Sequence, residues 1–350
     1  MDFHRRRVDW AAVAAVPVFG WLVIPTTIHA ERIGLSDPWL VMLAVPVGLL
    51  LAFRWPIASG VALAIGATWI RLVYLGVPDG SDQLIVSQAA SQLAFSGGNP
   101  YGVGYDASWP RDGSPFVYGP LELLAAPPGR IVEALAAGGT LVILAFMRSF
   151  LTLAAIGSHY LFVQFGMSGI NDNLPAFLIL AGLVTMRRHR MAGALLLVLA
   201  AGVKPYAFAW FPAAIGFAGI PVALALIAGS AIIWSPLLLG WGIPSFIRSI
   251  ELAALTHPFP ENTLNMPQWR IIAVPLALAS LLVRQWWVMV VAGLAIFCAV
   301  LFLDRWASYG YWLVVLPLVG MIGERAARFG LQAAVRMVRE RSTTVMAPVS

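Results

Sequence analysis

Two aspartates stand at the start of a long polar interval, about residues 78–118. Asp79 and Asp82 follow directly on an apolar stretch, where a helix would emerge from a membrane. A carboxylate there can take the proton of a substrate hydroxyl, a role that contributes roughly 10²–10⁴-fold to a rate. We therefore predict Asp82 to be a catalytic base, with Asp79 as the alternative. A solvated loop charge is the competing interpretation of either residue.

Lys204 is the one lysine among 22 basic residues. It lies between two apolar stretches and is followed by Pro205 and Tyr206. A charge at the centre of a membrane helix costs about 2.5–3.5 kcal/mol on insertion scales, and such residues are functional by default. A compact ammonium can stabilise the charge that grows on a departing phosphate. The position predicts a phosphate-binding lysine; a side chain that merely reaches the membrane interface is the alternative.

Further residues are candidates for binding. Arg71, Arg248 and Arg270 can contact the same phosphate, or each can be an interfacial charge. His257 lies in the polar segment HPFPENT and can bind an acceptor, transfer a proton or simply be satisfied within its loop. Asp172, between two asparagines, can contact sugar hydroxyls or cap the helix that follows.

Metal-ligand spacings are absent from the sequence, as are a phosphate-binding glycine loop and a Ser-His-Asp set. Asp79 and Asp82, together with Asp106 or Asp112, can in principle hold a divalent cation. We predict no metal site and no cofactor.

The elements that position these residues must lie in lipid. Of 350 residues, 60% are hydrophobic and only 11% are charged, whereas soluble domains carry about 25% charged residues. The mean hydropathy is +0.83. A soluble enzyme and a disordered regulator are excluded, and the lone cysteine, Cys298, excludes a disulfide scaffold. The net charge of +6 reflects membrane topology rather than a nucleic-acid partner.

Apolar stretches long enough for membrane helices recur along the chain. They cover about 10–29, 38–53, 57–77, 119–135, 139–165, 174–186, 191–204, 205–219, 221–240, 271–283, 286–303 and 310–323. We predict an all-α, polytopic membrane protein with about twelve (range ten to thirteen) spans. Residues 1–323 form one transmembrane domain, and residues 324–350 form a basic amphipathic tail on the inner membrane surface. Residues 82–96 are predicted to form a helix that lies flat on the bilayer.

Arginines set the predicted orientation, because loops on the inner side are enriched in them. With the N-terminus inside, most arginines fall in inner segments. These are Arg5, Arg6, Arg7, Arg54, Arg130, Arg187, Arg188, Arg190, Arg284, Arg325, Arg328, Arg336, Arg339 and Arg341. The two longest polar intervals, 78–118 and 241–270, then face the exoplasmic side as the first and second large outer loops.

Three segments resemble a known superfamily. The first outer loop carries Asp82, Ala89, Leu93, Gly97, Asn99, Pro100, Tyr101, Phe116, Tyr118 and Pro120 in a D…A-x-x-L-x-x-x-G-x-N-P-Y…F-x-Y-x-P arrangement. Further along, GINDN (169–173) is followed by a small-residue span with Lys204 and Pro212, and Glu261-Asn262-Thr263-Leu264 gives a third match. Over about residues 65–325 the chain resembles the GT-C glycosyltransferases, in particular bacterial polyprenyl-phosphate-mannose-dependent α-mannosyltransferases. Ile170 replaces the glutamine that the family often has.

The resemblance implies an activity and a site. A sugar, with mannose expected, passes with inversion from a polyprenyl-phosphate donor to a glycolipid or glycan acceptor on the exoplasmic face of the plasma or inner membrane. Asn99, Tyr101, Tyr118, Asp172, His257 and Asn262 are the implied substrate-binding residues. Much of the superfamily needs no metal with lipid-phosphate donors, and membrane lipids rather than nucleic acids are the expected partners.

Two alternatives stay open. A transporter or flippase of a lipid-linked glycan would place charges near the bilayer midplane and often shows inverted repeats, whereas here the charges gather in one outer loop. A catalytically inactive accessory protein is the third possibility, because the chain is short for the superfamily.

Overall fold

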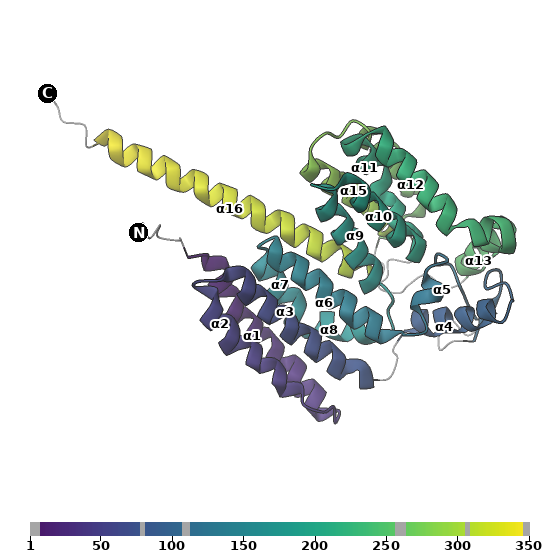
Figure 1. Ribbon diagram of the computed structural model, residues 1–350, viewed down its shortest axis with the longest axis horizontal. Coiled ribbons are helices and arrows are strands. Elements are labelled where there is room, and N and C mark those ends of the chain that lie inside the picture. The colour runs from purple at the N-terminus through teal and green to yellow at the C-terminus, as the bar shows by residue number, and fades with distance from the viewer. Residues whose placement is uncertain (1–7, 78–80, 107–112, 256–263, 305–308, 346–350) are drawn as a thin grey trace.

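The computed structural model describes residues 8–77, 81–106, 113–255, 264–304 and 309–345. Over these residues the chain is almost entirely helical, with one pair of two-residue strands (Figure 1). The predicted all-α class is confirmed. The helices form two groups, a loop layer that joins them on one side, and a long projecting C-terminal helix (Figure 1).

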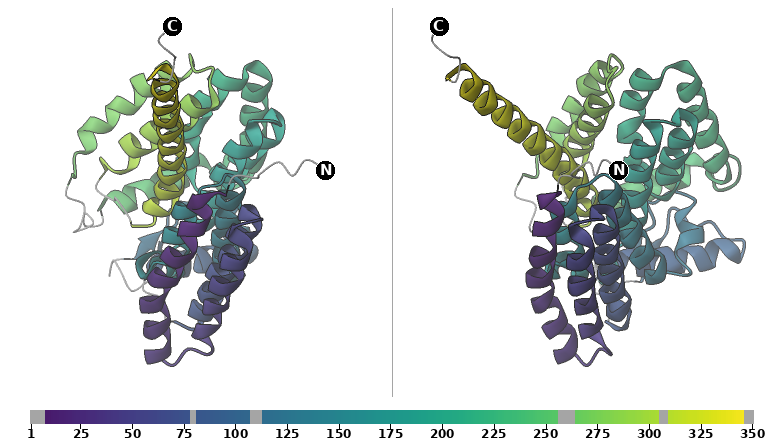
Figure 2. Two further views of the ribbon diagram at one scale, coloured as in Figure 1. Left: turned by 90° about the vertical axis from the view of Figure 1, so that its left-hand side faces the viewer. Right: turned by 60° about the vertical axis from the view of Figure 1, so that its left-hand side comes forward.

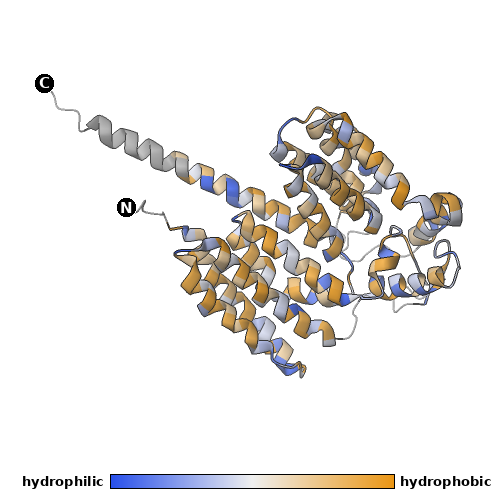
Figure 3. Cartoon of the chain, in the orientation of Figure 1, coloured by the Kyte–Doolittle hydropathy of each residue, from blue (hydrophilic) through white to orange (hydrophobic). Residues whose placement is uncertain are grey.

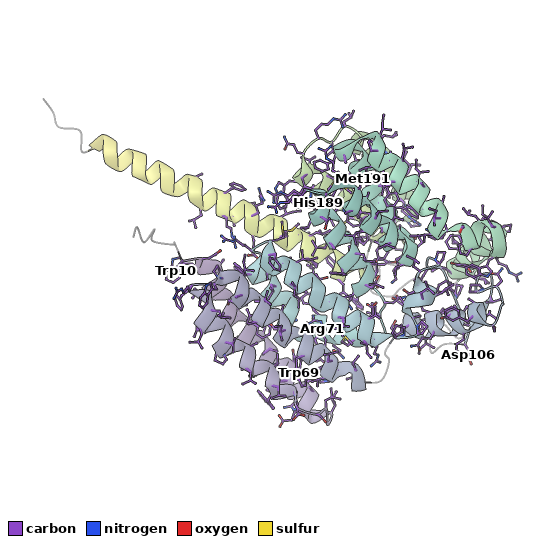
Figure 4. All side chains as sticks on the ribbon, viewed as in Figure 1. Trp10, Trp69, Arg71, Asp106, His189 and Met191 are labelled. Atoms are coloured by element: carbon purple, nitrogen blue, oxygen red, sulfur yellow. The ribbon has the colours of Figure 1, made fainter. Side chains whose placement is uncertain are left out.

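The first helix group is N-terminal. It contains α1 (Trp10–Arg32), α2 (Ala44–Ala52), α3 (Pro56–Val73), α6 (Arg130–Phe146), α7 (Phe150–Ser158) and α8 (Tyr160–Met167). Helix α3 packs against α2 and α6, and α1 packs against α7. Trp10 and Trp69 lie at opposite ends of this group (Figure 4). Short 3₁₀ turns, η1 (Pro38–Leu43) and η2 (Tyr74–Gly76), precede α2 and follow α3.

The second helix group follows in sequence. It contains α9 (Asn173–Met186), α10 (Arg190–Val203), α11 (Phe211–Ala218), α12 (Ile220–Ile233), α14 (Ala273–Ser280) and α15 (Trp286–Leu301). Its short turns are η3 (Pro205–Trp210), the π-helical η4 (Pro236–Trp241) and η5 (Pro267–Ile272). Helix α10 packs between α9 and α12, and α9 also packs against α6. The α6–α9 contact therefore joins the two groups.

The loop layer holds α4 (Asp82–Phe95), β1 (Gly104–Tyr105), β2 (Ser114–Pro115), α5 (Glu122–Ala125) and α13 (Ile243–Leu255). The two strands pair antiparallel, with Tyr105 opposite Ser114. A small hydrophobic cluster of its own holds the layer together; its buried members are Val86, Ala90, Tyr101, Tyr105, Phe116, Leu123 and Leu237. The described part of the first polar interval and the α13 segment of the second thus pack into one layer.

The predicted span 119–135 is wrong. Helix α5 has only four residues, and α6 begins at Arg130. Pro127 and Pro128 cannot donate a backbone hydrogen bond, and Gly129 has a positive φ of 53°, so no continuous helix can pass through them. Arg130 consequently lies beside the end of α3, where its guanidinium donates to the carbonyls of Leu75 (3.2 Å) and Val77, not at the predicted inner end.

Helix α4 begins and ends where the sequence predicts. The Ser81 hydroxyl accepts from the Gln83 amide at 3.3 Å and caps its start, and Gly97, with φ +87°, follows its end. Its buried face differs from the predicted apolar stripe, since Ser87 and Ser91 are buried and Phe95 is exposed. The Ser91 hydroxyl donates to the Leu123 carbonyl at 2.7 Å. That face of α4 thus packs against protein, and Phe95 lies on its exposed side. The expectation that α4 lies flat on the bilayer stays a prediction.

Helix α16 (Tyr311–Val345) is one continuous helix of 35 residues. The predicted boundary between domain and tail at 323/324 therefore falls inside a helix. At 1.5 Å per residue it is about 52 Å long, more than the roughly 30 Å hydrocarbon core of a bilayer. Its C-terminal half projects away from both helix groups (Figure 2).

Hydrophobic residues predominate in the helices of both groups (Figure 3), and many large ones are exposed. Leu239 is 88% exposed, Leu50 80% and Leu282 77%, an outer surface that suits lipid better than water. Among the described residues, two helices are long and apolar enough to cross a membrane: α1, and α3 with η2 (Pro56–Gly76). The pair α7–α8, bent by 61°, makes a third if it counts as one span. By this criterion the twelve predicted spans are not confirmed.

Candidate functional site

Helix α4 places Asp82 in its first turn, where the positive end of the helix dipole favours a carboxylate. The Ser114 hydroxyl, presented by β2, donates to Oδ2 of Asp82. Burial raises the pKa of the Asp82 carboxyl above its ordinary value, and the hydrogen bond from Ser114 lowers it by a smaller amount. Asp82 is only partly buried, so a substrate hydroxyl can reach a carboxylate that is more basic than usual.

Lys204 follows directly on α10. Pro205 restricts the residue before it to extended backbone, and Lys204 accordingly has φ −132° and ψ 125°. The helix therefore stops at Val203, and the lysine side chain points into the protein, where it is 3% exposed. Lys204 is a buried charge, so the interfacial alternative does not apply.

The ammonium of Lys204 has several partners. Its Nζ lies 2.7 Å from Oδ1 of Asp172 and 3.4 Å from Oε1 of Gln83. The Tyr206 hydroxyl donates to the same Oδ1 at 2.8 Å. The ring of Tyr118 lies 4.8 Å from Nζ, a distance at which an aromatic face attracts a cation. Asp172 and Lys204 form a buried ion pair with side chains 0% and 4% exposed.

Two glutamates extend this polar contact. Nδ2 of Asn171 donates to Oε1 of Glu122 at 2.7 Å and to Oγ of Ser87 at 3.1 Å. The backbone amide of Asn173 donates to Oε2 of Glu133 at 2.8 Å. We call the set the buried polar network; its members are Gln83, Ser87, Glu122, Glu133, Asn171, Asp172, Asn173, Lys204 and Tyr206. It lies where the loop layer meets the starts of α6 and α9 and the end of α10 (Figure 1).

Backbone hydrogen bonds fix the loop layer to α10. The amides of Gly119 and Leu121 donate to the carbonyls of Val203 (2.9 Å) and Gly202 (2.8 Å). A Cβ on Gly119 would lie 2.1 Å from the Gly202 oxygen, so only glycine permits this approach. The segment that carries Tyr118 is thereby held against Lys204.

The second oxygen of Asp172 is unusual. Oδ2 is buried and accepts no hydrogen bond among the described residues. A Cβ built on Gly310, which precedes α16, would lie 1.9 Å from it. Gly310 therefore leaves the space that the carboxylate occupies. Asp172 is the N-cap residue of α9, but its side chain makes no capping bond, so it acts as the partner of Lys204.

Tyr118 stands between the two acids singled out above. Burial, followed by the charges of Asp82 and Asp172, raises the pKa of the Tyr118 phenol well above its ordinary value. Because Gln83, which contacts Lys204, directly follows Asp82, the structure brings the predicted base, the predicted phosphate-binding lysine and Tyr118 into one region. The region therefore holds a carboxylate and a fixed cation, both of which interact with Tyr118.

Asn99 and Tyr101 hold the loop layer together. Asn99 donates through Nδ2 to the Trp241 carbonyl at 3.0 Å, and its Oδ1 accepts from the Tyr101 amide at 3.0 Å. The Tyr101 hydroxyl donates to the Tyr118 carbonyl at 3.0 Å, and its ring is buried beside Phe116. Asn99 thus links the segment before β1 to Trp241, and Tyr101 positions Tyr118. The substrate contacts expected of Asn99 and Tyr101 stay predictions.

The three arginines do not gather around Lys204. Arg71, labelled in Figure 4, is fully enclosed. It donates to the carbonyls of Ala67, Ile156 and Gly157, each at 2.9 Å, so it supports the end of α7, just before the break between α7 and α8. Arg270 pairs with Asp304 at 2.7 Å. Arg248 is exposed on α13, close to Gly102. Arg71 is thereby corrected from a phosphate ligand to a structural residue.

Asp79, His257 and Asn262 lie outside the described residues, as does Asp112 of the possible cation set. Asp106 is exposed. No three His, Cys, Asp or Glu side chains in the described part of the chain are grouped closely enough to hold a metal ion.

Sequence reasoning named only Asp172 and Lys204 among the members of the network. It missed Gln83, Ser87, Glu122, Glu133, Asn171, Asn173 and Tyr206. Glu122 and Glu133 carry a signal, because each is an acid inside an otherwise apolar run, and such residues are functional by default. Gln83 and Tyr206 carry none beyond their nearness to Asp82 and Lys204. No family model, no curated protein and no solved structure matches this chain.

Proposed function

We propose that this protein is a membrane glycosyltransferase of the GT-C type. It moves a sugar, with mannose the first candidate, from a polyprenyl-phosphate donor to a glycolipid or glycan acceptor. Its helices make about twelve crossings in this proposal, several of them by short helices joined to 3₁₀ turns such as η3 and α11. The loop layer faces the exoplasmic side of the plasma or inner membrane.

One observation carries the proposal. The first two of the segments that resemble the superfamily, far apart in sequence, meet in the fold. Lys204 contacts Gln83 and Tyr118, and the backbone of Gly119 bonds to Val203. The residues with chemical potential in each segment therefore face one another, as a shared active site requires.

The proposed reaction is a single displacement. Asp82 takes the proton of the acceptor hydroxyl, whose oxygen forms a bond to C1 of the donor sugar. The bond between C1 and the phosphate oxygen breaks, and the phosphate leaves with the electron pair. Attack from the opposite face inverts the configuration at C1. An ammonium has three N–H donors; Asp172 and Gln83 accept from Lys204, and the third donor is assigned to the phosphate.

Asp172 and Tyr206 position the lysine rather than touch the reacting atoms. Their bonds to one another and to Lys204 fix the ammonium before the donor arrives, so no reorganisation is needed as the phosphate gains charge. Glu122 accepts a hydrogen bond from the Asn171 side chain, and Glu133 accepts one from the Asn173 amide. The two glutamates thereby hold the residues that flank Asp172.

A second function, transport of a lipid-linked glycan, is favoured by a different observation. Three buried acids, Asp172, Glu122 and Glu133, surround the network's one lysine, and buried ionisable groups in membrane proteins often mark transport or proton pathways. An excess of acid is less suited to an anionic donor than to a proton or cation. Direct assay separates the two functions.

The test uses the purified chain in liposomes with radiolabelled polyprenyl-phosphate mannose and a bacterial membrane-lipid extract as acceptor source. We expect labelled mannose to appear in a new product, with Asp82→Asn slower by about 10²–10⁴-fold. Asp106→Asn, which removes an exposed acid of the same loop layer, is the matched control and should retain wild-type activity. Transfer by Asp82→Asn at the wild-type rate would remove Asp82 as the base. Movement of donor lipid across the liposome membrane without any transfer would favour the transporter.

A further inference from the structure

A basic cavity lies at the far end of the helices from the buried polar network. Helices α6 and α9 begin at the network. The 17 residues of α6 span about 25 Å, and the cavity opens just beyond its last residue. It has a volume of about 240 Å³, several times the roughly 30 Å³ of one water. We call it the inner pocket; its lining includes Arg148, Arg325, Arg328, Trp287, Met321 and Phe329.

Nearby carboxylates do not neutralise all three arginines of the inner pocket. Arg148 and Arg328 each approach Oδ2 of Asp9 only to 3.9 Å, and Arg328 approaches Oε2 of Glu324 to 3.9 Å. These separations exceed a hydrogen bond. Oε1 of Glu324 instead accepts from the amide and hydroxyl of Thr152, at 2.6 and 2.5 Å. Nη2 of Arg328 donates to the Arg148 carbonyl. With three arginines against Glu324 in its lining and Asp9 nearby, the pocket keeps a net positive charge for an anion.

The pocket wall also contains aromatic and apolar groups. The Arg325 guanidinium lies 4.3 Å from the ring centre of Trp287 and 5.2 Å from that of Phe329. Such stacking holds the planar guanidinium in one orientation, which favours two-point contact with a phosphate. Met321 is buried in the wall, whereas Phe146 and Phe329 beside the pocket are 63% and 57% exposed. Such an apolar rim does not contribute to the binding of a water-soluble anion.

We propose that the inner pocket binds the phosphate headgroup of an anionic phospholipid. Its acyl chains lie along the exposed apolar surface of α6 and α16, while Arg148, Arg325 and Arg328 contact the phosphate. Basic pockets between membrane helices on the inner side suit such lipids. The bound lipid would tie the start of α1, the α6–α7 turn and α16 together. This inference is independent of the glycosyltransferase proposal.

The experiment measures lipid retention by the full chain. The protein is incorporated into mixed phosphatidylcholine–phosphatidylglycerol vesicles, extracted in mild detergent, and its bound lipids are counted by native mass spectrometry. The double variant Arg325→Gln/Arg328→Gln is compared with Arg188→Gln/Arg190→Gln. The second pair removes the same charge from a neighbouring turn outside the pocket. A third variant, Arg148→Gln, changes a side chain that is 54% exposed and tests the pocket should the first double variant fail to fold.

We expect wild-type protein and the Arg188/Arg190 variant to retain phosphatidylglycerol over phosphatidylcholine. Retention should fall by about tenfold or more in the Arg325/Arg328 variant and by a smaller factor in Arg148→Gln. Equal losses in the pocket and control variants would overturn the proposal, because net charge alone would then explain retention. Displacement of the lipid by glycerol phosphate would also overturn it, in favour of a soluble phosphate ester. Unchanged retention in Arg148→Gln and the Arg325/Arg328 variant would exclude the pocket altogether.

Discussion

The buried polar network and the inner pocket are two charged sites of opposite construction. In the network, Lys204 and Asp172 are 2.7 Å apart and almost completely enclosed. In the inner pocket, the arginines stand 3.9 Å from their acids and remain partly exposed. A short, buried ion pair is fixed in place, whereas long, exposed pairs are easily exchanged for another ligand. The number of charges in a site therefore does not decide whether its ion pairs are fixed or exchangeable; their burial and distance do.

The largest expected effect tests this difference between the two sites directly. Lys204→Met leaves Asp172 as an unpaired buried charge and should cost about 3–5 kcal/mol of unfolding free energy. Adding Asp172→Leu should recover most of that loss while activity stays absent. By contrast, Asp9→Asn removes a partly exposed acid that lies 3.9 Å from two arginines of the inner pocket and should cost no more than about 1 kcal/mol. The free energy of unfolding is measured in mixed micelles for the wild type, Lys204→Met, the double variant Lys204→Met/Asp172→Leu and Asp9→Asn.

The sequence alone suggests that alanine at Lys204 spares folding, because an interfacial lysine contributes little to stability. The buried ion pair reverses that expectation. If Lys204→Met and Asp9→Asn prove equally mild, the distinction between a fixed and an exchangeable site fails.

A smaller effect tests the fit of Asp172. Gly310→Ala places a Cβ where Oδ2 of Asp172 lies, and overpacking of this kind typically costs about 1–3 kcal/mol. Gly323→Ala, also in the chain that forms α16, meets no atom within 4 Å and serves as the control. We expect lower stability and lower sugar transfer in Gly310→Ala only. Wild-type behaviour in both variants would show that the carboxylate has room to move.

The most subtle prediction concerns pH. Because burial raises the pKa of Asp82, its carboxylate is lost on acidification at a pH above that of an ordinary aspartate, about 3.9. Transfer that needs the ionised base should therefore fall as pH decreases through that raised pKa. Ser114→Ala removes a hydrogen bond that lowers the pKa, so the acid limb of the rate profile should move to higher pH. Ser96→Ala, at an exposed serine after α4, should leave the limb in place. A downward shift in Ser114→Ala would contradict the assignment.

Local patterns predicted much of this fold. The stretches 174–186, 191–204 and 286–303 correspond to α9, α10 and α15 within a few residues, because apolar runs and flanking proline or arginine specify them locally. The span at 119–135 failed because Pro127-Pro128-Gly129 outweighs apolar composition. The candidate site was predictable only in part. Lys204 and Asp82 are conspicuous by residue type, but the partnerships of Asp172 with Lys204 and of Glu122 with Asn171 join distant parts of the chain that no local pattern relates.

Structure determination with a bound donor lipid tests the central proposal most directly. The full chain in lipid nanodiscs is imaged by electron cryomicroscopy with and without excess polyprenyl phosphate, which keeps the leaving phosphate and lacks the sugar. We expect added density for a phosphate within hydrogen-bonding reach of Lys204 Nζ, on the side of Asp82, with the prenyl chain leaving between the loop layer and the second helix group. An unchanged Lys204–Asp172 pair with the lipid phosphate elsewhere would contradict the proposed active site.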